Sequence, residues 1–200
     1  MKILELGPSN VIGFFAEPVV GAALGVMPPP RGYFPEIDAV VKKYGILLVM
    51  DEVMSGSGRC GELFAHDAVA EGVRPDIMAM AKGLGAGYVT ISAILVNKMV
   101  AEVVKRDGMW QNSHTYQNHP INCAVAKKVL EIIEREDLCA NVRERGKQLI
   151  KELKEGFRDV PIVCDVRGKG LVTTFTPDFR LKTLKAKRSL LESSMIRRAR

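Results

Sequence analysis

The chain has 200 residues, of which 47% are hydrophobic and 26% are charged, and its formal net charge is +6. This length and composition suit a globular protein with one sizeable core, or a core with a small appended lobe, and they exclude a disordered chain. No run approaches the roughly 18–20 apolar residues that a membrane helix needs, and the N-terminal residues lack the apolar core of a secretory signal. We therefore expect a cytoplasmic protein without a membrane segment.

The positive charge is concentrated at the C-terminal end of the chain. Residues 180–200 contain eight basic residues and one acidic residue, a net charge of +7, so residues 1–179 carry a net charge of −1. The body of the protein therefore offers no basic surface for a nucleic-acid backbone. We interpret 180–200 as a divergent basic tail.

The cysteines and histidines predict no metal site. The cysteines are widely spaced and form no C-x-x-C pair, which indicates reduced thiols rather than a disulfide framework or a zinc site. His114 and His119 lie close in the sequence, but no third ligand is spaced to join them. The four cysteines are Cys60, Cys123, Cys139 and Cys164.

The first half of the chain predicts an α/β sheet. Short apolar runs at 11–16, 46–50, 77–81 and 89–96 are typical of buried strands, and apolar residues at helical spacing between Pro35 and Tyr44 predict a helix that ends at Gly45. The strand, helix, strand order predicts a right-handed parallel crossover. In such sheets ligands bind beyond the strand ends, where Glu17, Asp51 and Lys82 lie.

The pattern changes after Pro120. Apolar residues at helical spacing predict two long amphipathic helices, over 121–133 and 138–157. Runs at 161–166 and 170–175 then predict a pair of strands around Arg167-Gly-Lys-Gly170. We divide the chain into residues 1–134 of a large domain, residues 135–179 as the start of a small domain, and the tail at 180–200.

Lys82 is the first candidate for chemistry. It follows the apolar run 77–81 and precedes three glycines within five positions. A lysine in that setting can be desolvated, which lowers its pKa and allows its amine to form a Schiff base. This chemistry points to pyridoxal phosphate, with the lysine also moving a proton between the substrate and the cofactor. A solvated surface lysine is the alternative.

Asp51 is the second candidate. It ends the apolar run 46–50, and a carboxylate at the end of a buried strand needs a partner to offset its desolvation. The protonated pyridine nitrogen of pyridoxal phosphate is such a partner, because a carboxylate there keeps the ring electron-withdrawing. The alternative is an aspartate that caps a turn.

Thr115 is a third candidate and lies in a polar stretch before the first long helix. Its hydroxyl and nearby backbone N–H groups can bind phosphate oxygens.

Together these segments resemble the class III aminotransferases, the ω-aminotransferase group of the fold-type I pyridoxal phosphate enzymes. The resemblance extends over residues 5–175, with the lysine 31 positions after the aspartate. It implies the C-terminal half of a fold-type I large domain, a mostly parallel sheet with flanking helices, and the beginning of the small domain. The matching stretches are Ala16-Glu-Pro-Val-Val20, Gly32-Tyr-Phe34, Tyr44-Gly-Ile-Leu-Leu-Val-Met-Asp-Glu-Val53, Gly58-Arg59, Pro75-Asp-Ile77, Ala81-Lys-Gly-Leu84, Gly87-Tyr88, His114-Thr-Tyr116, His119-Pro120 and Arg167-Gly-Lys-Gly170.

The resemblance also implies roles for five residues. Lys82 would form the Schiff base with pyridoxal 5'-phosphate, and Asp51 would pair with the pyridine nitrogen. Val53 would pack on a face of the ring, and Glu17 would lie near the cofactor and substrate. Thr115 would bind the cofactor phosphate, typically that of the neighbouring subunit, which implies a homodimer with its active site at the interface.

The chain also departs from the family. Met54 stands where many members have a glutamine that binds the phenolic oxygen of the cofactor. Members are much longer, and this chain lacks their N-terminal phosphate loop, the aromatic residue that stacks on the ring and most of the small domain. We therefore expect a truncated form that is weakly active or inactive.

The sequence thus predicts an aminotransferase that moves an amino group from an amino acid or ω-amine to a 2-oxo acid such as pyruvate or 2-oxoglutarate. Two alternatives remain open at this point. One is an aminomutase or racemase on the same scaffold. The other is a non-catalytic interaction protein whose basic tail contacts nucleic acid or an anionic surface.

Overall fold

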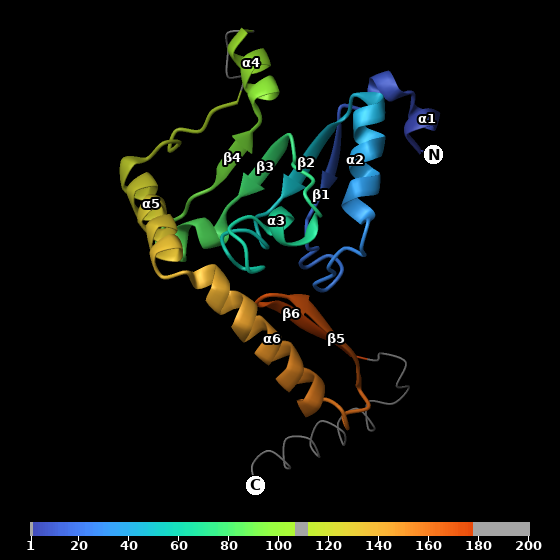
Figure 1. Cartoon of the computed structure of the whole chain (residues 1–200). Coiled ribbons are helices and arrows are strands. Elements are labelled where there is room, and N and C mark those ends of the chain that lie inside the picture. Colours follow the sequence, from blue (N-terminus) through green and yellow to red (C-terminus); the bar gives the residue numbers. More distant parts are fainter. Residues whose placement is uncertain (1, 107–111, 178–200) are drawn as a thin grey trace.

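The computed structural model describes residues 2–106 and 112–177, and Figure 1 shows their arrangement. The predicted basic tail at 180–200 lies outside the described residues. Within the described ranges, no helix is both long and apolar enough to cross a bilayer.

A four-stranded sheet forms the centre of the N-terminal part. Its strands are β1 (Gly13–Ala16), β2 (Leu47–Asp51), β3 (Ile77–Met80) and β4 (Ala93–Val96), arranged in that order across the sheet. β1, β2 and β3 are parallel, and β4 runs antiparallel to β3. The predicted α/β class with a mostly parallel sheet is confirmed, and its strands agree with the predicted runs except at the start of β4.

β4 begins at Ala93, four residues later than expected. Val89 and Ile91 instead pack against Gly85, where a Cβ would lie 3.3 Å and 3.1 Å from their Cγ2 atoms. Their apolar side chains therefore belong to the turn that follows β3. The predicted start of the strand at residue 89 is wrong for this reason.

Helix α2 (Tyr33–Tyr44) crosses from β1 to β2, as predicted. It ends at Gly45, whose φ of 65° places it in the left-handed conformation that favours glycine at a helix C-terminus. The helix begins two residues before Pro35, because Phe34 is buried with Val41 against the sheet and extends the packed face. The core on this side consists of Phe34, Val41, Ile46, Leu48, Met50, Ala70 and Val73.

Short helices occupy several connections. They are α1 (Lys2–Leu6), the 3-10 turn η1 (Pro8–Asn10), α3 (Ala65–Val69), the 3-10 turn η2 (Lys82–Gly85) and α4 (Lys98–Arg106). The Pro75-Asp-Ile77 stretch has a structural role here. The carboxylate of Asp76 accepts hydrogen bonds from the Leu48 N–H (2.8 Å) and from Asn97 Nδ2 (2.6 Å), so it ties β2 to the start of α4.

The C-terminal part consists of two helices and a hairpin. Helices α5 (Pro120–Arg135) and α6 (Leu138–Gly156) are followed by the antiparallel strands β5 (Val163–Lys169) and β6 (Val172–Pro177). Both predicted helices and the predicted strand pair are therefore present. α5 contacts η2, whereas α6 packs on β5, and Figure 1 shows α6 and the hairpin extending below the four-stranded sheet.

Candidate active site

Three parallel strands end at the same edge of the sheet. Ala16 of β1 is paired with Met50 of β2, and Asp51 is paired with Ala79 of β3. Glu17 directly follows β1, Asp51 ends β2 and Lys82 begins η2 just beyond β3. Because the carboxyl ends of parallel strands share one edge, the structure places these three charged side chains on neighbouring strand ends.

Lys82 occupies a strained backbone position. Its φ of 45° lies in the left-handed region that non-glycine residues rarely adopt. The side chain is exposed, and no hydrogen bond or ion pair links its amine to any residue that the structure describes. The expectation of a desolvated lysine is therefore wrong for this chain, because no described segment covers the amine.

The carboxylate of Asp51 is also exposed, which corrects the expectation of a compensated, desolvated group. Its Oδ1 accepts a hydrogen bond from the Val53 N–H at 2.9 Å, so the aspartate does brace the turn that follows β2. Within residues 2–106 and 112–177 no cation pairs with it. The second carboxylate oxygen thus remains available for a ligand.

The neighbouring Glu52 is completely buried. Its carboxylate accepts hydrogen bonds from the backbone N–H groups of Ala65 (2.6 Å) and His66 (2.9 Å), and it lies 2.7 Å from His66 Nδ1. A buried carboxylate is tolerated only when such bonds offset its lost hydration. Glu52 therefore fixes the turn after Asp51 to the start of α3, a role for which the sequence carried no signal beyond the acidic pair.

The turns after β2 and β3 touch each other. A Cβ at Gly83, next to Lys82, would lie 2.9 Å from the Cβ of Ser57. Only glycine allows that approach without a shift of one turn. The contact brings the segment that follows Asp51 against the segment that carries Lys82.

Glu17 and Met54 lie together beside the same edge. The Glu17 carboxylate accepts a hydrogen bond from the Gly21 N–H at 2.9 Å. A Cβ at Gly21 would clash with the Met54 sulfur and would lie 3.3 Å from Glu17 Oε2. Val53, the predicted ring contact, is half-buried in the adjoining turn.

Thr115 belongs to a turn and not to one of the three strand ends. It is exposed in the segment that precedes α5, and no hydrogen bond or ion pair among the described residues joins it to Glu17, Asp51 or Lys82. The local bonds of the segment are made by its neighbours, such as the Tyr116 N–H to His114 Nδ1 at 3.2 Å. A role for Thr115 toward another subunit stays a prediction.

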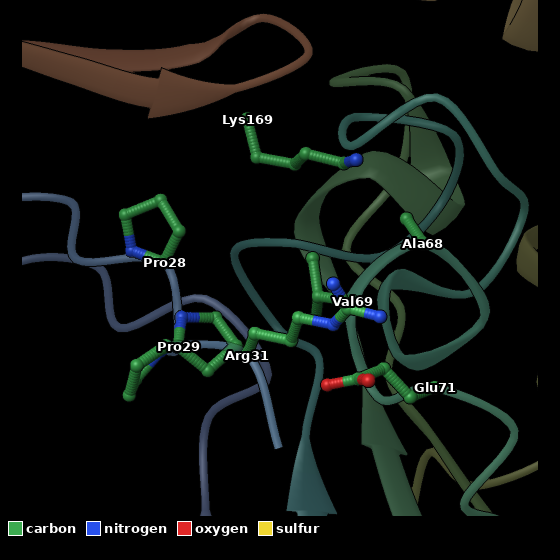
Figure 2. Close-up of a pocket in the computed structure, with 8 residues that line it drawn as sticks. Pro28, Pro29, Arg31, Ala68, Val69, Glu71 and Lys169 are labelled. Atoms are coloured by element: carbon green, nitrogen blue, oxygen red, sulfur yellow. The ribbon is translucent and has the colours of Figure 1, made fainter. Parts of the chain in front are cut away.

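No group of three potential metal ligands occurs within the described residues. A cavity of about 400 Å³ lies elsewhere, between the loop residues 28–31, α3 and the end of β5 (Figure 2). Arg31 and Lys169 project into it from two segments, and none of the five candidate residues lines it. At the strand-end edge, by contrast, the side chains of Asp51 and Lys82 are exposed.

The charges at this edge nevertheless suit the two ends of pyridoxal phosphate. An unpaired carboxylate at Asp51 can hold a protonated ring nitrogen, and an unpaired amine at Lys82 can react with an aldehyde. Asp51 ends β2 and Lys82 follows the adjacent strand β3, and the turns after these two strands are in contact. Nothing in the donor set conflicts with that cofactor.

Comparisons with known proteins agree with the resemblance. A family model described as "Aminotransferase class-III" matches residues 1–191. An aminotransferase of Gibberella zeae is 44% identical over 170 residues, which cover 84% of this chain and 33% of that protein. The mitochondrial gamma-aminobutyrate transaminase 1 of rice (Oryza sativa subsp. indica) is 40% identical over 177 residues, which cover 85% of this chain and 33% of that protein.

Solved structures give the same result. The crystal structure of a thermostable (S)-enantioselective omega-transaminase from Thermomicrobium roseum matches with a TM-score of 0.84 and 41% identity, covering 89% of this chain and 39% of that one. An ornithine delta-aminotransferase from Plasmodium falciparum matches with a TM-score of 0.80 and 36% identity, covering 89% of this chain and 45% of that one. The chain thus spans about a third of the length of these curated relatives. The chain belongs to the class III aminotransferases, a family of pyridoxal phosphate-dependent enzymes.

Proposed function

We propose that this chain is part of an aminotransferase that moves an amino group from an amino acid or ω-amine to a 2-oxo acid. One observation carries the proposal: Asp51 and Lys82 stand at adjacent strand ends, and neither charge has an ionic partner among the described residues. The names of the relatives, which include gamma-aminobutyrate and omega transaminases, support amine donors of this kind. They favour transfer over an aminomutase or racemase activity.

When bound, pyridoxal 5'-phosphate supplies an electron-withdrawing ring that stabilises negative charge at the substrate α-carbon. The carboxylate of Asp51 would keep the ring nitrogen protonated, and Val53 would contact a face of the ring. Lys82 would hold the cofactor through its amine and would carry a proton at Nζ to and from the substrate. Glu17 would lie beside the reacting groups, and the hydroxyl of Thr115 would bind the phosphate of a neighbouring subunit.

The remainder of the site is proposed to come from protein that this chain does not contain. Both central side chains are exposed, and the chain covers 33% of the Gibberella and rice relatives. We infer that other segments and a second subunit of a homodimer supply the walls that exclude water, and that the 200 residues alone turn over little or no substrate. We also propose a cytoplasmic location for this chain, although a rice relative is named mitochondrial and a tomato relative chloroplastic.

The test is whether the chain selects Lys82 among its exposed lysines. Purified protein is mixed with pyridoxal phosphate, reduced with borohydride to fix the cofactor to the lysine that holds it, and mapped by peptide mass spectrometry. We expect modification concentrated at Lys82, lost in Lys82→Ala and retained in the control Lys147→Ala, whose side chain is exposed on α6. Equal modification of Lys82, Lys147 and other surface lysines would reject the proposed site.

A further inference from the structure

Arg167 joins the β5–β6 hairpin to the loop that follows β1. Its side chain is 21% exposed, and all five N–H groups of its guanidinium have an acceptor. Three of these bonds reach the loop and two stay within the hairpin. They are Nε to the carbonyl of Val26 (3.0 Å), Nη2 to the carbonyls of Leu24 (3.0 Å) and Gly25 (2.7 Å), and Nη1 to Asp165 Oδ2 (2.5 Å) and Thr176 Oγ1 (2.8 Å).

The loop that Arg167 holds is short and closed at its base. Val20 and Met27 exchange backbone hydrogen bonds of 3.0 Å and 2.8 Å, and the irregular residues between them carry the three carbonyls bound by Arg167. Carbonyls of irregular backbone need a partner when they are removed from water. The planar fork of a guanidinium can reach three carbonyls at once, whereas a lysine ammonium offers its donors from a single point.

A chain of hydrogen bonds leads from this loop to the candidate site. The Val26 carbonyl accepts from Arg167, and the Val26 N–H donates to the Gly21 carbonyl at 2.9 Å. The Gly21 N–H in turn donates to the carboxylate of Glu17 at 2.9 Å. The orientation of Glu17 is thereby linked to a side chain that lies 150 positions later in the sequence.

The hairpin itself is seated on the turn that follows β2. A Cβ at Gly170 would lie 2.5 Å from the carbonyl oxygen of Arg59, and the Leu171 N–H donates to that oxygen at 3.0 Å. A Cβ at Gly168 would clash with the carbonyl oxygen of Val172 on the facing strand. The glycines of the Arg167-Gly-Lys-Gly170 stretch therefore set the distance at which Arg167 meets the loop.

We propose that Arg167 is a positioning residue that holds the loop 20–27 and, through Gly21, orients the Glu17 carboxylate at the strand-end edge. The part of this inference that gives Glu17 a place beside the substrate rests on the proposed function. The part that concerns the loop does not. The apolar contacts of Val19, Val26 and Val172 are independent of the guanidinium and keep the hairpin docked when it is replaced.

The test is residue-resolved amide hydrogen exchange on the full 200-residue chain without cofactor. In Arg167→Lys we expect exchange at Gly21 and Val26 to rise about tenfold or more, because the loop can open without first breaking the hydrogen bonds of the guanidinium. The amides of β2 should exchange as they do in the wild type. Glu17→Gln should raise exchange at Gly21 and leave Val26 protected. This difference would show that Val26 lies nearer to Arg167, and Gly21 nearer to Glu17, in the chain of hydrogen bonds. The control is Arg158→Lys, an exposed arginine whose side chain makes no hydrogen bond or ion pair among the described residues.

A second variant keeps the test decisive if Arg167→Lys fails to fold. The double variant Asp165→Ala with Thr176→Val retains the arginine but removes its two hairpin acceptors, and a smaller rise at the same two amides is expected. Unchanged exchange at Gly21 and Val26 in a folded variant, or a rise spread evenly over the whole chain, would overturn the proposal. If the cofactor did not select Lys82, the proposed function would be rejected, and the inference that Arg167 holds the loop 20–27 would still stand.

Once pyridoxal phosphate is bound, a spectroscopic comparison separates positioning from simple support of the fold. If Arg167 acts through Glu17, then Arg167→Lys and Glu17→Gln shift the absorption band of the cofactor in the same direction. The protein that combines Arg167→Lys with Glu17→Gln should then show no further shift of the band. Arg158→Lys should show no shift at all. Additive shifts of Arg167→Lys and Glu17→Gln would contradict a common route through Glu17.

Discussion

The carboxylate of Glu52 lies 2.7 Å from Nδ1 of His66, and the two side chains are 0% and 4% exposed. This buried pair stands one residue beyond Asp51 and fixes the turn that connects β2 to α3. Because the same carboxylate also accepts two backbone N–H groups, it supports the geometry of the candidate site without taking part in its chemistry.

Replacing Glu52 should destabilise the whole fold. Glu52→Ala leaves two backbone N–H groups and the His66 ring without their acceptor in a buried setting, so we expect the free energy of unfolding to fall by about 3 kcal/mol or more. The matched control is Glu62→Ala, because Glu62 is half-exposed and pairs with Arg143 at 3.1 Å. Exposed pairs contribute about 0–1 kcal/mol. Equal losses in urea titrations of the two variants would contradict this account.

Cys60 should make the stability of the protein fall at alkaline pH. Burial, and then the charge of Glu52, raises the pKa of its thiol from 9.0 to about 12. Above pH 9 the unfolded chain loses this proton while the folded chain keeps it, so stability decreases with rising pH until the folded pKa is reached. The group contributes a loss of at most about 1.4 kcal/mol per pH unit.

The measurement is the free energy of unfolding at about pH 8 and about pH 10 for the wild type and for Cys60→Ala. The decline between the two conditions should be smaller in the variant. Cys123→Ala, at an exposed thiol, serves as control and should decline as the wild type does. A Cys60→Ala variant with the full alkaline decline would show that this thiol titrates normally in the folded state.

Gly83→Ala should disturb the contact between the turns after β2 and β3. The new methyl group would lie 2.9 Å from the Cβ of Ser57, and such overpacking typically costs about 1–3 kcal/mol. We expect lower stability together with less pyridoxal phosphate fixed at Lys82 by borohydride. Adding Ser57→Gly should restore part of both losses. Without any rescue, the defect would have to come from the backbone at residue 83 and not from the contact.

The fold could be predicted from local patterns where neighbours along the chain decide the outcome. The apolar run before Asp51 and the helical spacing between Ile37 and Tyr44 each gave an element close to that observed, because periodicity reports which face is buried. β4 was placed too early because the side chains of Val89 and Ile91 pack on Gly85, which no local pattern reveals.

The position of Asp51 and Lys82 at the strand ends was predictable from the sequence, but their environment was not. The order of the parallel strands was enough to expect Asp51 and Lys82 at one edge. Their burial was predicted wrongly, since burial depends on what covers a strand end and not on the run that leads to it. Glu52 binds partners 13 and 14 positions away, and the loop partners of Arg167 are 141 to 143 positions away, beyond the reach of any local pattern.

The central claim is that Asp51 and Lys82 bind opposite ends of the same cofactor ring. The most direct measurement is the ¹⁵N chemical shift of the ring nitrogen in labelled pyridoxal phosphate bound to the chain at neutral pH. We predict a protonated nitrogen in the wild type, an unprotonated one in Asp51→Asn, and no bound signal in Lys82→Ala. A ring nitrogen whose protonation is unchanged in Asp51→Asn would contradict the account.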